Sequence, residues 1–388
     1  MDKIFRRCVF GVQRWKPELV LAALLLPALA TAQTASPAEA MALEQQGKLP
    51  EAIEAWQAVT QHNPQDARAF ASLGVDLARE QKYKEAAAAY RKAIALNPKL
   101  PGIHLNLGLA EYKQGEFQPA IAPLKAALLY DPQNKQARTL LGLSCYGAGH
   151  FAEAATYIEP VAKGDPNNVE LHQVLAQSCL RAKKYSCALD EFRQILQQNP
   201  DSAAAHVLTG EALDGLGRSP EAIAEFQAAI KADPKEPNAN FGLGYLHWKL
   251  RQYDDAKSAF ERELSIDPNH PQALAYLGDI EMKRNDPEKA LALLQKAVRL
   301  RDDIRLAYVD MGAILAEQKH YPEAVAALQR SEKLDPTQPD AHFRLGRAYQ
   351  AMGNSAASQK EFAKVRELHE KAEESLASKM SPAPAESH

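Results

Sequence analysis

Cysteines and aromatic residues are scarce in this 388-residue chain, which has 4 Cys and an aromatic content of 7%. Four cysteines cannot form the disulfide framework that holds together a small secreted domain. Neither sign of charge predominates, because 46 Lys and Arg face 49 Asp and Glu for a net charge of −3. There is therefore no overall positive field to attract nucleic acid. With 46% apolar and 24% charged residues, the composition is that of a folded chain and excludes wholesale disorder or a polytopic membrane protein.

Signatures of catalysis and of phosphate binding are missing as well. The chain has no G-x-S-x-G nucleophile elbow, no phosphate-binding glycine loop and no His-Glu-x-x-His metal-binding helix. We therefore expect a protein that is not an enzyme and that needs no cofactor.

The first thirty residues have the pattern of an export signal. The apolar run Leu19–Ala30 has 12 residues, too few for a bilayer span, which needs about 20. The segment before it is basic, with Lys3, Arg6, Arg7, Arg14 and Lys16. Small residues, Ala30-Thr31-Ala32, follow the apolar run, as at a signal cleavage site. We expect cleavage after Ala32, or after Ala30, and a periplasmic or secreted protein, whereas an uncleaved membrane anchor is the alternative.

A 34-residue period runs through the rest of the chain. Asp-Pro or Asn-Pro pairs recur at this spacing, and at the one skipped step Asp302 keeps the frame without a proline. The prolines are Pro64, Pro98, Pro132, Pro166, Pro200, Pro234, Pro268 and Pro336. With the proline at position 32, ten units cover residues 33–66, 67–100, 101–134, 135–168, 169–202, 203–236, 237–270, 271–304, 305–338 and 339–372. Repetition at such a period is typical of a stack of similar modules.

Three positions within the unit are constant in size. Position 8 is glycine in eight units and alanine in two, position 20 is alanine in nine, and position 24 is bulky in all ten. The glycines are Gly74, Gly108, Gly142, Gly210, Gly244, Gly278, Gly312 and Gly346. The bulky residues are Trp56, Tyr90, Leu124, Ile158, Phe192, Phe226, Phe260, Leu294, Leu328 and Phe362. A glycine inside a helix lowers stability by up to about 1 kcal/mol. Eight glycines at the same position of the repeat therefore indicate a packing requirement, in which two helices approach each other closely.

Each unit therefore predicts two antiparallel helices joined by a tight turn. Two stretches of apolar periodicity, each of about 13 residues, flank a short polar break. The break often has glycine at position 15, as in Gly47, Gly115, Gly149, Gly217 and Gly353. The proline at position 32 ends the second helix and forces the preceding residue out of helical geometry.

This pattern resembles the tetratricopeptide repeat, whose signature is W-x2-L-G-x2-Y, then A-x3-F, then P, on a 34-residue period. The resemblance covers residues 33–372 and is weakest at position 4, which is never Trp. It implies an all-α fold, a right-handed superhelical α-solenoid of about ten helix-turn-helix repeats in one elongated domain. The charged run that continues past Glu370 resembles a C-terminal capping helix. We expect that helix to end, and a disordered tail to follow, within residues 373–388.

Four of the 11 histidines occupy position 4 of their units. They are His104, His172, His206 and His342. This position faces the neighbouring helix, and successive units lie roughly 20 Å apart when two helices separate them. We therefore expect packing histidines and no shared metal site.

In the tetratricopeptide family the first helix of each unit lines an inner groove, chiefly through positions 2, 5, 9, 12 and 13. Here these positions carry two apolar and aromatic groups. The first is Leu105, Leu109, Tyr112, Leu143 and Tyr146, and the second is Phe241, Tyr245 and Trp248. Rigid rings of this kind anchor protein partners. The alternative is that the side chains pack between adjacent repeats, since a one-residue shift would place Tyr112 and Trp248 in the core.

Three cysteines remain after removal of the predicted signal. Cys179 and Cys187 occupy positions 11 and 19 of the unit 169–202 and flank its turn. A disulfide needs Cα atoms about 4.4–6.8 Å apart, so only side chains that point across the hairpin qualify. A Cys179–Cys187 bond and two separate buried thiols both remain open, and Cys145 is expected to be a buried thiol.

Together these features predict a non-enzymatic protein–protein interaction scaffold in the bacterial cell envelope. It would bind peptide segments or partner proteins in the groove, without nucleic acid and without stable membrane insertion of the mature chain. A structural or assembly subunit of an envelope, polysaccharide-export, pilus or secretion system is the alternative. The carboxylate clamp of chaperone-binding relatives is absent, because positions 5 and 9 of the second unit are Ala71 and Val75.

Overall fold

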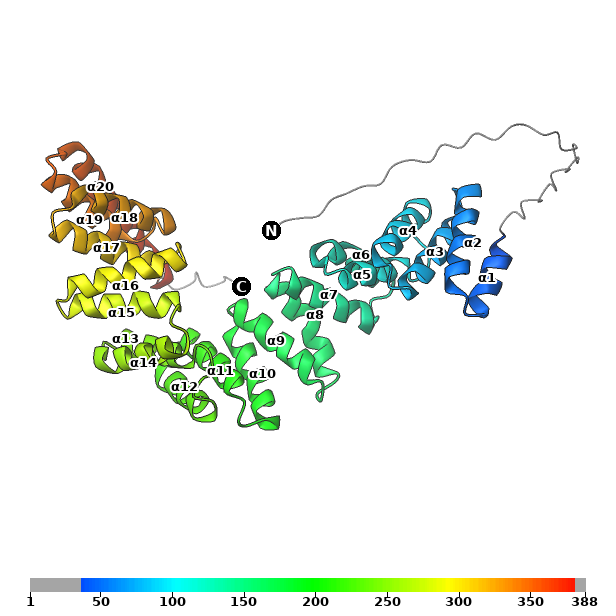
Figure 1. Ribbon diagram of the computed structural model, residues 1–388, viewed down its shortest axis with the longest axis horizontal. Coiled ribbons are helices and arrows are strands. Elements are labelled where there is room, and N and C mark those ends of the chain that lie inside the picture. The colour runs from blue at the N-terminus through cyan, green and yellow to red at the C-terminus, as the bar shows by residue number, and fades with distance from the viewer. Residues whose placement is uncertain (1–35, 381–388) are drawn as a thin grey trace, which may run out of the picture. The chain divides into compact units, whose positions relative to one another are not determined.

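The computed structural model describes residues 36–380 and contains twenty α-helices and no strand in that range (Figure 1). This confirms the all-α fold predicted from the sequence. The predicted signal sequence, residues 1–32, lies outside the described residues, as do residues 381–388 of the predicted tail. The chain divides into two compact units, one up to Leu100 and the other from Pro101 onward.

The helices occur in consecutive pairs. The first unit contains α1 Pro37–Gln45, α2 Leu49–His62, α3 Ala67–Arg79 and α4 Tyr83–Leu96. The second unit begins with α5 Ile103–Lys113, α6 Phe117–Tyr130, α7 Lys135–Gly147, α8 Phe151–Lys163, α9 Val169–Arg181, α10 Tyr185–Gln198, α11 Ala203–Gly215 and α12 Ser219–Ala232. It continues with α13 Ala239–Lys249, α14 Tyr253–Ile266, α15 Pro271–Lys283, α16 Pro287–Leu300, α17 Arg305–Glu317, α18 Tyr321–Leu334, α19 Pro339–Ala351 and α20 Ser355–Met380.

Packing in the second unit differs between the two helices of a pair. Consecutive helices contact each other along the whole unit, in chain order. The first helices of successive pairs also contact each other, from α5 and α7 through to α17 and α19, whereas successive second helices such as α6 and α8 make no comparable contact. The repeats therefore converge on the side of the first helices. We call the surface formed by the odd-numbered helices α5 to α19 the inner face.

The turn inside each pair requires a left-handed residue. The residue at position 15 has a positive φ in all ten 34-residue repeats, and it is glycine in only five of them. The non-glycine residues are Gln81, Lys183, Arg251, Asn285 and Lys319, with φ between 58° and 64°. A left-handed residue just after a helix end lets its backbone N–H bond the last carbonyls. The sequence signal at this position is therefore weaker than the structural requirement.

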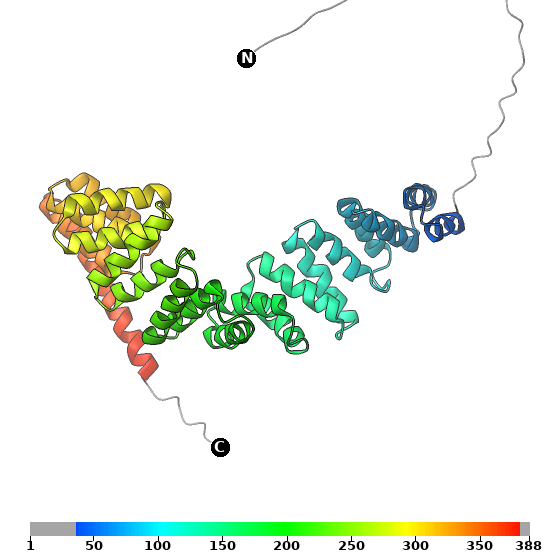
Figure 2. The same cartoon turned by 60° about the horizontal axis from the view of Figure 1, so that its bottom comes forward.

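The second helices end where the sequence predicts. In α4, for example, the helix stops at Leu96, two residues before Pro98. The tenth repeat lacks this proline, and α20 continues without a break for 26 residues. Figure 2 shows the C-terminal part of α20 running past its neighbours. The expected charged capping helix is thus the continuation of the last second helix.

The glycine at position 8 lies directly against the bulky residue at position 24 of the same unit. A Cβ built on Gly278 would lie 2.7 Å from Cγ of Leu294 and 3.3 Å from the backbone oxygen of Ala290, the residue at position 20. The seven other position-8 glycines also face the position-24 side chain of their own unit. Leu294 and Ala290 are fully buried. The alternation of small and large residues therefore sets the distance between the two helices of a pair.

Among the described residues, none of the helices combines the length and the apolar character that a membrane span requires.

We predict that Gly278→Ala lowers the free energy of unfolding by about 1–3 kcal/mol, because the added methyl group overlaps Leu294 and the backbone of α16. On helix propensity alone the same change would stabilise by about 1 kcal/mol. The exposed Ala292→Gly variant of α16 measures that propensity difference without a packing change. Urea denaturation followed by circular dichroism makes the comparison, and a Gly278→Ala variant that is more stable than wild type would contradict the packing account.

Candidate partner-binding face

The first predicted group of groove residues lies on α5 and α7. Leu105, Leu109, Tyr112, Leu143 and Tyr146 are all half-buried. The rings of Tyr112 and Tyr146 each pack edge-on against the aromatic residue at position 17 of their own unit, Phe117 and Phe151, at centroid distances of 5.7 and 5.8 Å. These side chains contribute to the core between repeats and keep part of their surface exposed.

The second group forms a larger aromatic cluster on α13 and α15. Phe241, Tyr245 and Trp248 are joined by Tyr276, a residue at position 6 that the sequence analysis does not select. The Tyr276 ring lies 5.5 Å from that of Tyr245 and 4.9 Å from that of Trp248. All four side chains are half-buried. We call these four residues the aromatic cluster.

The start of α13 is held by a buried carboxylate. Glu263 of α14, which is 1% exposed, accepts hydrogen bonds from the backbone N–H groups of Asn238 and Phe241, both at 3.0 Å. These are N–H groups at the first turn, where a helix has no internal acceptors. The Phe241 ring also stacks on His270 at 4.8 Å and contacts the fully buried Phe260 at 5.9 Å. Phe241 is therefore held in place at both its backbone and its ring.

Two aromatic residues at position 12, Tyr146 and Trp248, reach across to the next repeat. The Trp248 Nε1–H donates a hydrogen bond of 2.6 Å to Oδ2 of Asp279. In the same register, the hydroxyl of Tyr146 donates to the side-chain oxygen of Gln177. Both acceptors occupy position 9 of the following unit. In these two repeats position 12 thus joins neighbouring repeats, as the packing interpretation expects, and both rings remain half-buried.

Two lysines stand beside the aromatic cluster. The Nζ atom of Lys249 lies 5.8 Å from the centroid of Tyr245, and that of Lys283 lies 6.0 Å from the centroid of Trp248. Each also forms an ion pair, Lys249 with Asp214 at 2.5 Å and Lys283 with Asp279. The lysines therefore cover ring faces and carry little unbalanced charge.

Asp279 has a second buried carboxyl group next to it, Asp310 of α17. The two residues are 1% and 3% exposed. Burial, and then the negative charge of Asp279, raise the pKa of Asp310 to about 8 against the opposing effect of Lys283 and Arg344. Asp310 is therefore held mainly in its protonated form near neutral pH.

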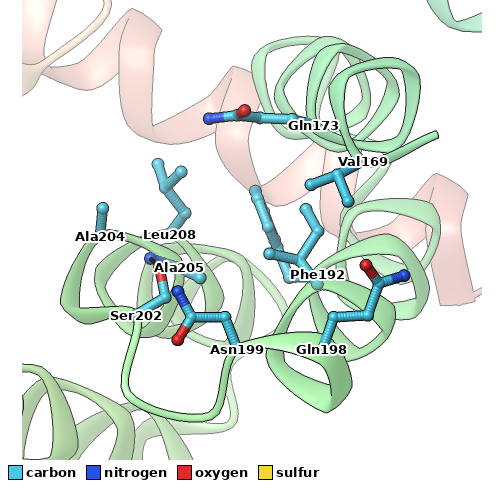
Figure 3. Close-up of a pocket in the computed structure, with 10 residues that line it drawn as sticks. Val169, Gln173, Phe192, Gln198, Asn199, Ser202, Ala204, Ala205 and Leu208 are labelled. Atoms are coloured by element: carbon cyan, nitrogen blue, oxygen red, sulfur yellow. Dashed lines mark hydrogen bonds between the residues drawn. The ribbon is translucent and has the colours of Figure 1, made fainter. Parts of the chain in front are cut away.

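A separate cavity of about 360 Å³ opens between α9, α10 and α11 (Figure 3). The amide side chains of Gln173, Gln198 and Asn199 line it together with the apolar Val169 and Leu208. Figure 3 shows Gln173 and Val169 on one side and Leu208 on the opposite side. No ionisable side chain lines the cavity, so it is suited to an uncharged group.

The histidines at position 4 bond within their own hairpins. His172, His206 and His342 each place Nδ1 next to a glutamate 19 residues later, at 2.5, 2.6 and 2.7 Å. His104 stacks instead on Tyr130, at 5.5 Å. The pairs tie the first helix to the second, and no two of these histidines share a site.

Cys179 and Cys187 form a disulfide across the hairpin of α9 and α10, with their Cα atoms 5.9 Å apart. Cys145 is a free, fully buried thiol, and burial raises its pKa to about 11. Closing so short a loop stabilises by about 2–3 kcal/mol, enough to stiffen one repeat without determining the fold.

The profile described as "Tetratricopeptide repeat" matches residues 105–169, 139–196, 174–237 and 241–303, more than half of the chain, and a second one matches residues 340–372. The profile described as "TPR repeat" matches residues 76–115 and 312–353. The chain belongs to the tetratricopeptide repeat family. Tetratricopeptide repeat proteins are generally non-catalytic scaffolds for protein–protein interaction.

Solved structures of tetratricopeptide repeat proteins are similar to the chain. A chain of the APC/C hetero-tetramer Cut9-Hcn1 is 13% identical in sequence, with a TM-score of 0.52. The match covers 85% of this chain and 80% of that chain. YrrB, described as a TPR protein with an unusual peptide-binding site, matches with 23% identity, 49% of this chain, 98% of that chain and a TM-score of 0.39. The structure of pilF of Pseudomonas aeruginosa is 15% identical in sequence, with a TM-score of 0.48. The match covers 53% of this chain and 93% of that chain. No curated protein matches at a significant level.

The pKa of Asp310 predicts a pH-dependent stability. Because the folded state raises this pKa above its value of 3.8 for a free side chain, the fold favours the protonated carboxyl. The resulting stabilisation is complete below pH of about 4 and is lost as the pH rises toward 8. We predict that Asp310→Asn removes this loss, so that the variant gains at least about 1 kcal/mol relative to wild type between pH 4 and 8. Parallel stability curves for the two proteins in urea denaturation would show that Asp310 does not titrate in this way.

Proposed function

We propose that the protein is a non-enzymatic scaffold that binds segments of partner proteins on its inner face, and that it does so in the cell envelope after export. The aromatic cluster carries this proposal. Four large rings lie side by side on two first helices and retain exposed surface, and two of them, Phe241 and Tyr276, pack on the buried Phe260. Rings held rigid before binding provide contact area at a low cost in conformational entropy.

The surroundings of the aromatic cluster suit an extended or helical segment. The rings belong to α13 and α15, which contact each other, so the exposed ring surface continues from one repeat to the next. Polar groups border it, because the ion-paired Lys249 lies over Tyr245 and the ion-paired Lys283 lies over Trp248. An apolar centre with a polar border is the usual composition of a protein interface.

Two observations support export. The sequence of residues 1–32 has the basic, apolar and small-residue order of a signal. The Cys179–Cys187 disulfide belongs to the kind of bond that persists in oxidising compartments such as the periplasm. Both fit a protein that works outside the cytoplasm.

The test is a comparison of two tyrosines. Peptides are first selected from a displayed random library on the folded wild-type protein, and their affinities are measured by fluorescence anisotropy. We predict that Tyr245→Ala weakens their binding at least about tenfold, a loss of about 1.4 kcal/mol, because Tyr245 lies at the centre of the aromatic cluster.

Tyr157→Ala is the matched control. Tyr157 is also half-buried, but it lies on α8, which is the second helix of its pair and does not form the inner face. This variant should therefore lose comparable stability and keep its affinity for the peptides. Equal binding by Tyr245→Ala and wild type, or equal losses in the two variants, would contradict the proposal.

A further inference from the structure

Three metal-ligating side chains converge near the C-terminal end of the second unit. Glu332 comes from α18, His342 from α19 and Glu361 from α20. The His342 Nδ1 atom lies 2.7 Å from Oε2 of Glu361 and 4.0 Å from Oε1 of Glu332. One ligand atom from each residue lies within 4.8 Å of the other two. The cluster does not involve the aromatic cluster or any other residue of the proposed function.

The three side chains differ in how firmly they are held. The side chain of His342 is 3% exposed, that of Glu361 14% and that of Glu332 36%. The imidazole is therefore fixed by packing, whereas the Glu332 carboxylate can rotate. On the far side of the ring, Nε2 is buried and has no hydrogen-bond partner among the described residues. No hydrogen bond at Nε2 therefore fixes the tautomer, so the neutral ring can carry its proton on Nε2 and leave the lone pair of Nδ1 to a metal ion.

The distances suit a small divalent ion after a modest adjustment. Zn²⁺ binds imidazole nitrogen and carboxylate oxygen at about 2.0–2.2 Å in a tetrahedron, which places the ligand atoms about 3.3–3.6 Å from one another. Glu361 would retreat from His342 by less than about 1 Å, and Glu332 would approach by a similar distance. Neither glutamate has a lysine or arginine within ion-pair distance in residues 36–380. A doubly charged cation would therefore neutralise two carboxylates that otherwise face each other.

The other repeats show what distinguishes this position. His172 and His206 have the same bond to a glutamate 19 residues later. The residue ten positions before the histidine, which is Glu332 in the last repeat, is Ala162 and Leu196 in the other two. The histidine–glutamate pair alone is thus a device that joins the two helices of a hairpin. Only the last of the three pairs receives a third ligand from the preceding repeat.

The remaining coordination position faces a cavity of about 410 Å³ that these three residues line together with Lys360, Ala363, Lys364 and Glu367. Lys364 is paired with Glu367 at 2.9 Å, so its charge is already balanced within the cavity wall. A water molecule could complete the tetrahedron from this side, as in zinc sites with three protein ligands.

We propose that Glu332, His342 and Glu361 form a binding site for a first-row divalent transition metal, of which Zn²⁺ is the best match. The imidazole ligand favours Zn²⁺, Co²⁺ or Ni²⁺ over Mg²⁺ and Ca²⁺, which prefer ligand sets made only of oxygen. The bound ion connects α18, α19 and α20 and thereby ties the last repeat to the one before it.

The experiment measures Zn²⁺ binding to the untagged full chain after treatment with a chelator, by isothermal titration calorimetry. We expect one Zn²⁺ per chain, with an affinity that falls at low pH because protons compete with the metal ion for its ligands. Glu332→Ala introduces the residue that stands at the equivalent position before His172, which is Ala162. Because the Glu332 side chain is partly exposed, the variant should fold. This variant should bind Zn²⁺ at least about tenfold more weakly.

Two controls separate this site from adventitious binding. Glu225→Ala removes the carboxylate of a histidine pair that has no third ligand, and it should leave Zn²⁺ affinity unchanged. Co²⁺ provides an independent readout, since its visible absorption should show tetrahedral coordination in wild type and change in Glu332→Ala and Glu361→Gln. Absence of a one-to-one site, or a site whose affinity and Co²⁺ spectrum survive Glu332→Ala, would overturn the proposal.

Discussion

The contact between a position-8 glycine and the bulky residue at position 24 sets the geometry on which the rest of the structure depends. Because the glycine has no side chain, Leu294 or its equivalent in another repeat fills the space between the two helices. The resulting short distance brings position 4 near the residue 19 places later, which explains the recurrent histidine–glutamate bonds.

Contacts between repeats build on this hairpin geometry. In two repeats the side chain at position 12 bonds to position 9 of the next repeat, where Tyr146 reaches Gln177 and Trp248 reaches Asp279. These links hold successive first helices together in the second unit, where second helices make no corresponding contact. A face that is both the convergent side of the repeats and the location of the aromatic cluster is the natural surface for a partner. The disulfide in α9 and α10 stiffens one hairpin on this same framework.

Repetition made the fold predictable and limited the prediction of the sites. The period, the glycines and the prolines determine where helices begin, end and pair, and each signal occurs many times in the sequence. The left-handed turn residue was predicted only where it is glycine, because residues such as Lys183 and Arg251 carry no comparable signal. Tyr276 was missed because position 6 lies outside the positions taken to line a groove. The acidic pair Asp279–Asp310 and the ligand Glu332 depend on packing between repeats, which the alignment of units does not describe.

The central claim is that partners bind where the rings of the inner face lie, and hydroxyl-radical footprinting tests it most directly. Oxidation of aromatic side chains is measured by mass spectrometry on the free protein and on its complex with a selected peptide. The account predicts that the peptide protects Tyr245, Trp248 and Tyr276 and leaves Tyr157 of α8 unchanged. Protection of Tyr157 with unchanged oxidation of the aromatic cluster would place the partner on the other side of the repeats and contradict the account.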